Sequence, residues 1–155
     1  MHLKNFFKSM MAGAIGSLAH TTLMLAKSKL GLMPTFQPYL DMQTYLTGLI
    51  GSDVPVIVPW ALSFINGSVV LGFLFSIMYK LLPGRHGYSK GFAFGIMGWV
   101  MMGLFFFPMM GYGIFASGTS MNLMPALFSL LMILTYSITL GLAYSLLTPR
   151  LHNFY

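Results

Sequence analysis

Residues 91–149 read GFAFGIMGWVMMGLFFFPMMGYGIFASGTSMNLMPALFSLLMILTYSITLGLAYSLLTP, fifty-nine positions without one Lys, Arg, Asp or Glu. A bilayer hydrocarbon core about 30 Å thick needs about 20 apolar residues to be crossed as a helix. Fifty-nine residues are too many for one crossing and suit two. Pro108, the glycines at 111 and 113, and Pro125 mark a turn between them. The stretch therefore predicts a transmembrane hairpin.

The composition points to lipid rather than water as the surrounding medium. The chain has 155 residues, of which 57% are hydrophobic and only 6% are charged, and its mean hydropathy is +0.79. A soluble domain carries about 25% charged residues. The net charge of +6 does not indicate nucleic-acid binding, because the basic residues are scattered at the ends of apolar runs. The absence of cysteine excludes disulfides and thiolate metal sites.

The preceding residues predict a second hairpin. A charge-free run over residues 9–26 ends at Lys27 and Lys29, and another covers residues 54–79. The basic N-terminus resembles a signal peptide, but the apolar run is too long for one, so we expect a retained first span. We expect a single transmembrane domain over residues 1–155, with spans at about 6–27, 56–80, 91–112 and 123–147.

Residues 38–50 are too few and too polar to cross a bilayer. Apolar and polar side chains alternate there at helical spacing, and Tyr39 and Tyr45 are suited to the membrane–water interface. We expect a short amphipathic helix lying in the interface on the outer side of the membrane. An ordinary ordered loop is the alternative.

The two hairpins share a motif. Residues 68–76 and 137–145 both read Ser-x-x-Leu-Gly-x-x-aromatic-Ser, and a weaker match aligns Gly13-x-x-Gly16 with Gly95-x-x-Gly98. Because each half has an even number of spans, the repeats are parallel rather than inverted. The expected fold is an all-α integral membrane four-helix bundle made of two transmembrane hairpins in a weak parallel repeat, plus the interfacial helix.

Small residues recur at helical spacing on each predicted span. Such stripes let membrane helices approach closely, so we expect helix packing or a partner face there. The residues that form them are Gly13, Gly16, Ser17, His20, Ser68, Gly72, Ser76, Gly91, Gly95, Gly98, Ser137, Gly141 and Ser145.

Basic residues predict the orientation. With the N-terminus in the cytoplasm, six of them face the cytoplasm and only Lys27 and Lys29 face outward, as the positive-inside rule requires. Both termini are then cytoplasmic. The six residues are Lys4, Lys8, Lys80, Arg85, Lys90 and Arg150.

His20 and Asn66 are the strongly polar side chains within the predicted spans, and they form a possible intramembrane polar site. His20 is interpreted foremost as a neutral imidazole bonded across a helix interface. Proton transfer, haem or copper ligation with a Met, and contact with a partner subunit are the alternatives. Asp41 and Asp53 are the only carboxylates and form no buried acid–base pair. No metal site, catalytic set or cofactor motif is expected, and the chain is interpreted as non-enzymatic.

Three motifs resemble a family of small bacterial four-span membrane proteins classed as a domain of unknown function. They are Leu81-Leu82-Pro83-Gly84-Arg85, the segment 107–115, and Ser137-x-x-Leu140-Gly141-x-x-Tyr144; Lys29-x-Gly31-Leu32-Met33-Pro34 also fits. The resemblance implies a protein of the bacterial inner membrane with no established activity. In this family the second span often carries a His, which is Asn66 here, and this argues against a paired-His cofactor site.

The leading functional hypothesis is a non-catalytic subunit that packs in a larger membrane complex, such as a respiratory or electron-transfer assembly. Little soluble mass and a small-residue stripe on every span favour it. The alternative is a small homo-oligomeric transporter or channel with His20 and Asn66 lining the pathway. A membrane enzyme or haem carrier is the third hypothesis. The expected partners are the lipid bilayer and other membrane subunits or copies of the chain itself, without nucleic acid.

Overall fold

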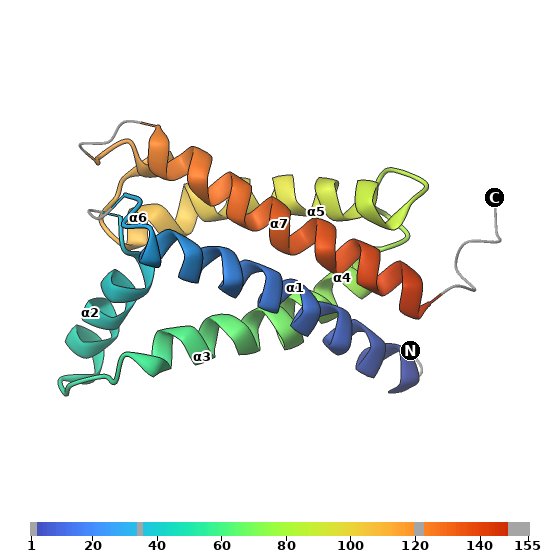
Figure 1. The fold of residues 1–155 in the computed structure, drawn as a ribbon, viewed down its shortest axis with the longest axis horizontal. Coiled ribbons are helices and arrows are strands. Elements are labelled where there is room, and N and C mark those ends of the chain that lie inside the picture. The colour runs from blue at the N-terminus through green and yellow to red at the C-terminus, as the bar shows by residue number, and fades with distance from the viewer. Residues whose placement is uncertain (1–2, 34–35, 120–122, 149–155) are drawn as a thin grey trace.

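The computed structural model describes residues 3–33, 36–119 and 123–148, and in these ranges every regular element is a helix. Six elements in the middle of the chain combine into two longer rods, because π-helical segments continue directly into α-helices (Figure 1). The elements are α1 (Leu3–Lys29), α2 (Pro38–Ile50), α3 (Ile57–Ile65), π-helix η1 (Asn66–Leu71), α4 (Gly72–Met78), α5 (Gly87–Met101), π-helix η2 (Met102–Phe106), α6 (Phe107–Met109), 3₁₀-helix η3 (Ile114–Ala116) and α7 (Met124–Leu147).

Four of the resulting helices are long and apolar enough to cross a membrane, which confirms the all-α, four-span fold. They cover Asn5–Lys29, Ile57–Met78, Gly87–Met109 and Met124–Leu147. In Figure 1, α1 and α5 run in the same direction, and the start of α1 lies at the same end of the bundle as the end of α7. The two hairpins are therefore parallel. Below, the end that carries α2 is called the α2 end.

The third span begins four residues before the charge-free stretch. Helix α5 starts at Gly87, directly after the extended N-cap residue His86, whose backbone N–H donates to the Ser89 hydroxyl at 3.3 Å. Lys90 then lies inside the helix rather than before it. Its side chain turns back so that Nζ donates to the Tyr79 carbonyl oxygen at 2.6 Å. A flexible lysine stem thus lets a charged residue occupy the first turn of a span.

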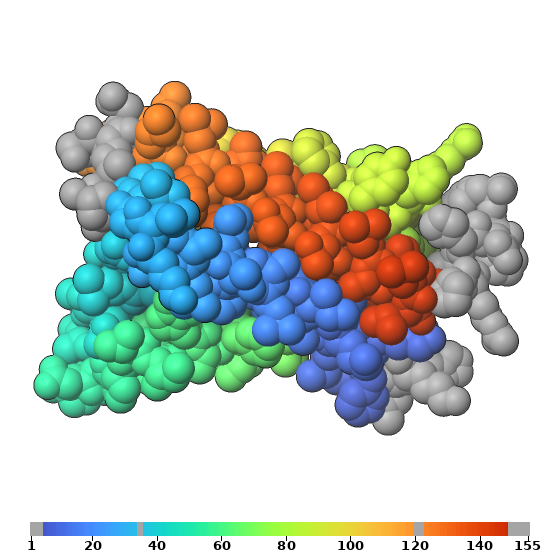
Figure 2. All heavy atoms as spheres, in the orientation of Figure 1, coloured from blue at the N-terminus to red at the C-terminus, as the bar shows by residue number. Residues whose placement is uncertain are grey.

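The helices do not pack equally on one another. Helix α7 lies between α1 and α5 and contacts both, whereas α1 also packs along η1 and α4. Figure 2 shows α1 (blue) resting against α7 (orange to red) along most of its length. Consistent with this central place, 44% of the apolar window of α7 is buried, against 22% for the second and third spans.

Aromatic side chains fill the core away from the α2 end. Phe75 is fully buried and meets Tyr144 edge-on, with ring centroids 5.7 Å apart and an interplanar angle of 89°. These two residues hold the same position in the repeated motif, so the two halves of the chain contact each other through equivalent side chains. Phe94 packs on Phe75 at 5.2 Å and completes the contact between the hairpins.

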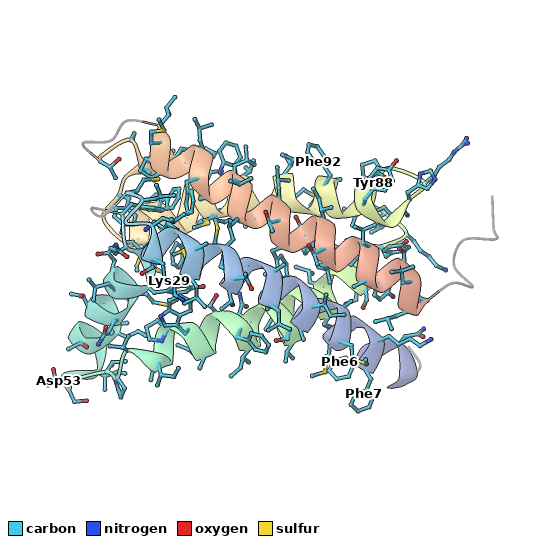
Figure 3. All side chains as sticks on the ribbon, in the orientation of Figure 1. Phe6, Phe7, Lys29, Asp53, Tyr88 and Phe92 are labelled. Atoms are coloured by element: carbon cyan, nitrogen blue, oxygen red, sulfur yellow. The ribbon has the colours of Figure 1, made fainter. Side chains whose placement is uncertain are left out.

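Helix α2 closes the opposite end and has no buried residue. It links α1 to α3 outside the bundle of spans (Figure 1). Figure 3 shows Lys29 and Asp53 at this end, and Phe6, Phe7 and Tyr88 toward the other. Of the basic residues used to predict orientation, Arg150 lies outside the described residues, as does the side chain of Lys4.

Candidate functional site

The first hairpin is held by backbone contact between small residues. A Cβ atom added to Gly13 would lie 2.6 Å from the Ser68 carbonyl oxygen, and one added to Gly72 would lie 2.6 Å from the Ser9 carbonyl oxygen. Both distances are shorter than real Cβ atoms show. Helices α1 and η1–α4 therefore touch backbone to backbone, which only glycine permits at these positions.

The second hairpin repeats this crossing. Gly91 faces the Ser137 carbonyl oxygen and Gly141 faces the Gly87 carbonyl oxygen, each too closely for a Cβ. Gly95 lies against the Ser137 hydroxyl. By contrast Gly98 is exposed, and a Cβ there would meet only Ile133 Cγ2 at an ordinary 3.8 Å.

The equivalent contacts define how the two halves correspond. The contact of Gly13 with Ser68 in the first hairpin is equivalent to the contact of Gly91 with Ser137 in the second. Likewise, the contact of Gly72 with Ser9 is equivalent to the contact of Gly141 with Gly87. Gly13 therefore corresponds to Gly91, one helical turn before the alignment with Gly95 that the glycine spacing suggested. With this correspondence, the first hairpin is nine residues longer than the second, counted from Gly13 to Ser68 and from Gly91 to Ser137.

A three-helix junction joins the first hairpin to α7. The Tyr136 hydroxyl donates to the Gly67 carbonyl oxygen at 2.6 Å. The Ser17 hydroxyl lies so close to Gly67 that a side chain would not fit there. Gly16 touches the Tyr136 backbone. The Gly67 carbonyl also accepts the backbone N–H of Gly72, the five-residue bond of a π-helix. The extra hydroxyl donor thus lies where the α-helical bond pattern is interrupted.

His20 and Asn66 lie in different surroundings. His20 is half-buried on α1, one turn beyond Ser17, whereas Asn66 begins η1 and its side chain is exposed. No hydrogen bond of the Asn66 side chain is present among the described residues.

The last serine of each repeated motif bonds within its own helix. The Ser76 hydroxyl donates to the Phe73 carbonyl oxygen and the Ser145 hydroxyl to the Leu142 carbonyl oxygen, each at 2.8 Å.

A buried lysine at the α2 end was not singled out by the sequence. Lys27 is only 2% exposed, and its ammonium donates to the Phe36 carbonyl oxygen and faces the Phe36 ring at 5.6 Å. Asp41 on α2 attracts the same ammonium electrostatically, and it accepts a hydrogen bond from the Tyr112 hydroxyl. Burial raises the pKa of Asp41, although the Gln37 backbone and Lys27 oppose that shift. The cluster connects α1, α2 and the loop after α6.

Two adjoining cavities open at this end. A groove of about 710 Å³ runs between α1 and α3, and it is almost wholly apolar, with Thr21, Leu25, Ala61, Phe64 and Ile65 among its lining residues. A smaller pocket of about 280 Å³ is more polar. Val56 and Trp60 line both cavities.

The polar pocket is bounded by α1, α2 and the residue before α2. Lys27, Ser28, Gln37 and Gln43 contribute its polar groups. Tyr39 and Trp60 form one wall as a tilted pair with ring centroids 4.2 Å apart. Neither His20 nor Asn66 lines either cavity. Among the described residues, no group of three or more His, Asp or Glu side chains is placed to hold a metal ion.

Comparison with known protein families finds a match over most of the chain. The model of a family described as "Family of unknown function (DUF6789)" matches residues 3–153. No curated protein and no solved structure matches the chain.

Proposed function

Since this chain belongs to the DUF6789 family of unknown function, as its motifs indicated, we propose a function from its own geometry: it is a non-catalytic membrane subunit that packs against another membrane protein. The observation that carries the proposal is the exposed side chain of Asn66 in the middle of the second span. In this proposal the chain lies in the bacterial inner membrane with both termini in the cytoplasm.

An amide facing lipid is costly. Asn carries two donors and one acceptor, and hydrocarbon offers none of these groups a partner. Polar side chains in spans usually bond to a neighbouring helix, each for about 0.6–2 kcal/mol. Because the described part of this chain offers Asn66 no such bond, a partner helix would supply it.

The residues around Asn66 form an apolar surface that fits a helix. Leu62 and Val70, each one turn away, are 44% and 53% exposed. We call Leu62, Asn66 and Val70 the Asn66 face. It is separate from most of the small-residue stripes, whose glycines at 13, 72, 91 and 141 contact helices of the same chain. A partner that binds the Asn66 face therefore leaves the bundle intact.

The test is native isolation. The chain, expressed from its own locus with a small tag, is extracted without detergent into polymer-bounded discs and its co-purifying proteins are identified. Wild type should bring down one or more larger membrane proteins in fixed ratio, and Asn66→Leu should lose them. Thr22→Val is the matched control, because Thr22 is also polar and exposed but bonds to its own helix at 2.8 Å.

Two results would overturn the proposal. In one, the wild-type particle contains this chain as a single copy; in the other, Asn66→Leu keeps every partner. A particle built only from copies of the chain would favour the alternative function, a homo-oligomeric transporter with His20 and Asn66 on its pathway. In that case His20→Ala should abolish flux in liposomes without changing assembly.

A further inference from the structure

We propose that the two cavities at the α2 end form one binding site for an anionic phospholipid. One acyl chain lies in the apolar groove between α1 and α3, and the phosphate lies in the polar pocket beside Lys27. The inference is independent of the Asn66 face, since Asn66 lines neither cavity.

The groove has the length of one leaflet. Its lining on the second span runs from Val56 to Ile65, and nine steps of about 1.5 Å along a helix give roughly 13 Å. Half of a hydrocarbon core about 30 Å thick is roughly 15 Å. An acyl chain from one leaflet therefore fills the groove, whereas a partner transmembrane helix would require a surface about twice as long.

The pocket has the charge that a phosphate requires. Among the described residues, Lys27 is the only charged one in the lining, and no carboxylate is present there. An ammonium has three donors, and one of them is used by the Phe36 carbonyl oxygen. The nearby Asp41 does not line the pocket, and its carboxylate accepts a hydrogen bond from the Tyr112 hydroxyl. Ser28 and the Gln37 amide add further hydrogen-bonding groups. The Gln43 amide nitrogen donates one hydrogen bond to the Val54 carbonyl oxygen at 2.7 Å and keeps a second N–H.

The two parts of the site meet at the right depth. Tyr and Trp gather where the hydrocarbon ends and the headgroups begin. Here Trp60 lines both cavities and packs on Tyr39 of α2. The Tyr39 hydroxyl is held by Ser63 at 3.0 Å, so this aromatic pair is fixed between the acyl groove and the headgroup pocket.

Trp60 is also the reporter for the test. Full-length protein carrying Trp99→Phe, with Trp60 as its one tryptophan, is reconstituted in phosphatidylcholine bilayers. A small fraction of the lipid has a brominated acyl chain, which quenches tryptophan on contact, and carries either a phosphatidylglycerol or a phosphatidylcholine headgroup. Quenching should require about tenfold less of the anionic lipid, the preference expected from one charge-assisted contact.

Matched pairs of variants locate the two halves of the site. Lys27→Met should abolish the headgroup preference. Lys29→Met removes the same charge from an exposed position two residues further along α1, and it should keep the preference. Ala61→Phe fills the groove and should reduce quenching by both lipids, whereas Ala26→Phe, at an exposed position outside both linings, should not. If Lys27→Met does not fold, the loss of quenching in Ala61→Phe, together with the headgroup preference of the parent protein, tests the proposal.

Several results would overturn the lipid assignment. They are equal quenching by the two brominated lipids in the parent protein, unchanged quenching in Ala61→Phe, and loss of the preference in Lys29→Met. A Trp60 that neither lipid reaches would mean that a protein segment covers the groove. Removal of the preference by millimolar inorganic phosphate would assign the pocket to the free ion instead.

Discussion

Replacing Gly91 with alanine should destabilise the bundle, whereas the same change at Gly98, seven residues further along α5, should not. A Cβ at Gly91 would lie 3.0 Å from Ile138 Cα and closer still to the Ser137 carbonyl oxygen. Both obstacles are backbone atoms, so no side chain can rotate away. Helices α5 and α7 would have to separate until the contact reaches an ordinary 3.4 Å or more.

The magnitude follows from the comparison of the two sites. Inserting a methyl group into a well-packed contact costs about 1–3 kcal/mol, and alanine returns about 0.8–1.0 kcal/mol of helix propensity. Gly98→Ala gains the propensity without the clash, because its Cβ would meet Ile133 at 3.8 Å. The gain in helix propensity is the same in both variants, so it cancels from the difference between their unfolding free energies. Their unfolding free energies should therefore differ by about 1–3 kcal/mol, with Gly91→Ala the less stable.

The assay is reversible unfolding of the purified protein by SDS in mixed micelles, followed by circular dichroism and by tryptophan fluorescence. Agreement of the two probes tests whether the transition is two-state. If the variants unfold within about 0.5 kcal/mol of each other, backbone contact between α5 and α7 is not what holds the second hairpin, and the correspondence between the two halves loses its physical basis.

Three further results are expected from the same assay. Tyr136→Phe should lower the unfolding free energy by about 0.6–2 kcal/mol, because the bond to the Gly67 carbonyl oxygen is lost; a Tyr88→Phe control, at a residue 52% exposed, should be neutral. Lys90→Met should cost about 1–3 kcal/mol, since its ammonium bonds to Tyr79 and lies 4.5 Å from that ring; an effect as large in the exposed Lys80→Met would contradict this reasoning. Asp41 has a folded-state pKa raised above its ordinary 3.8 by burial, so the folded state binds the proton more readily, and wild type should gain stability relative to Asp41→Asn as the pH falls from neutral toward 3.8. A difference that stays constant across this range would show that the carboxyl is not desolvated.

The number of spans could be predicted because hydrocarbon imposes a length on each of them. Charge-free runs located the four helices, and helical spacing located α2. The exact start of α5 could not be predicted in this way, since charge patterns cannot reveal that the Lys90 side chain turns back to Tyr79. Nor could the π-helical segments, because Asn66–Leu71 has no residue pattern that distinguishes it from an α-helix.

The small-residue stripes illustrate both the value and the limit of spacing. Gly91, Gly95 and Gly98 share one helical face in the sequence, but the crossing with α7 reaches only the first two. The position at which two helices cross depends on both helices, and a residue pattern on one helix does not contain it.

The burial of Lys27 could not be predicted either. Lys27 was treated as a topology signal at a helix end, and its burial depends on Phe36 folding back over it. The cavities beside it lie where α1 and α3 diverge toward the α2 end (Figure 1), and no local motif encodes that divergence.

The π-helix η1 sets the relative rotation of the two halves of the second span. An α-helix advances about 100° per residue, and a π-helical segment holds one extra residue within nearly the same rotation. If Asn66–Leu71 were wound as a regular α-helix of the same length, everything before it would be turned by about 100° relative to Phe75. Trp60 would then swing away from α1 while Gly72 kept its contact with Ser9. The π-helix therefore lets Ile57–Ile65 present one face of the rod independently of the face with which Gly72–Met78 packs on α1. A deletion of one residue within Asn66–Leu71 would instead restore α-helical winding and leave both parts facing as they do, because the π-helix accommodates one extra residue.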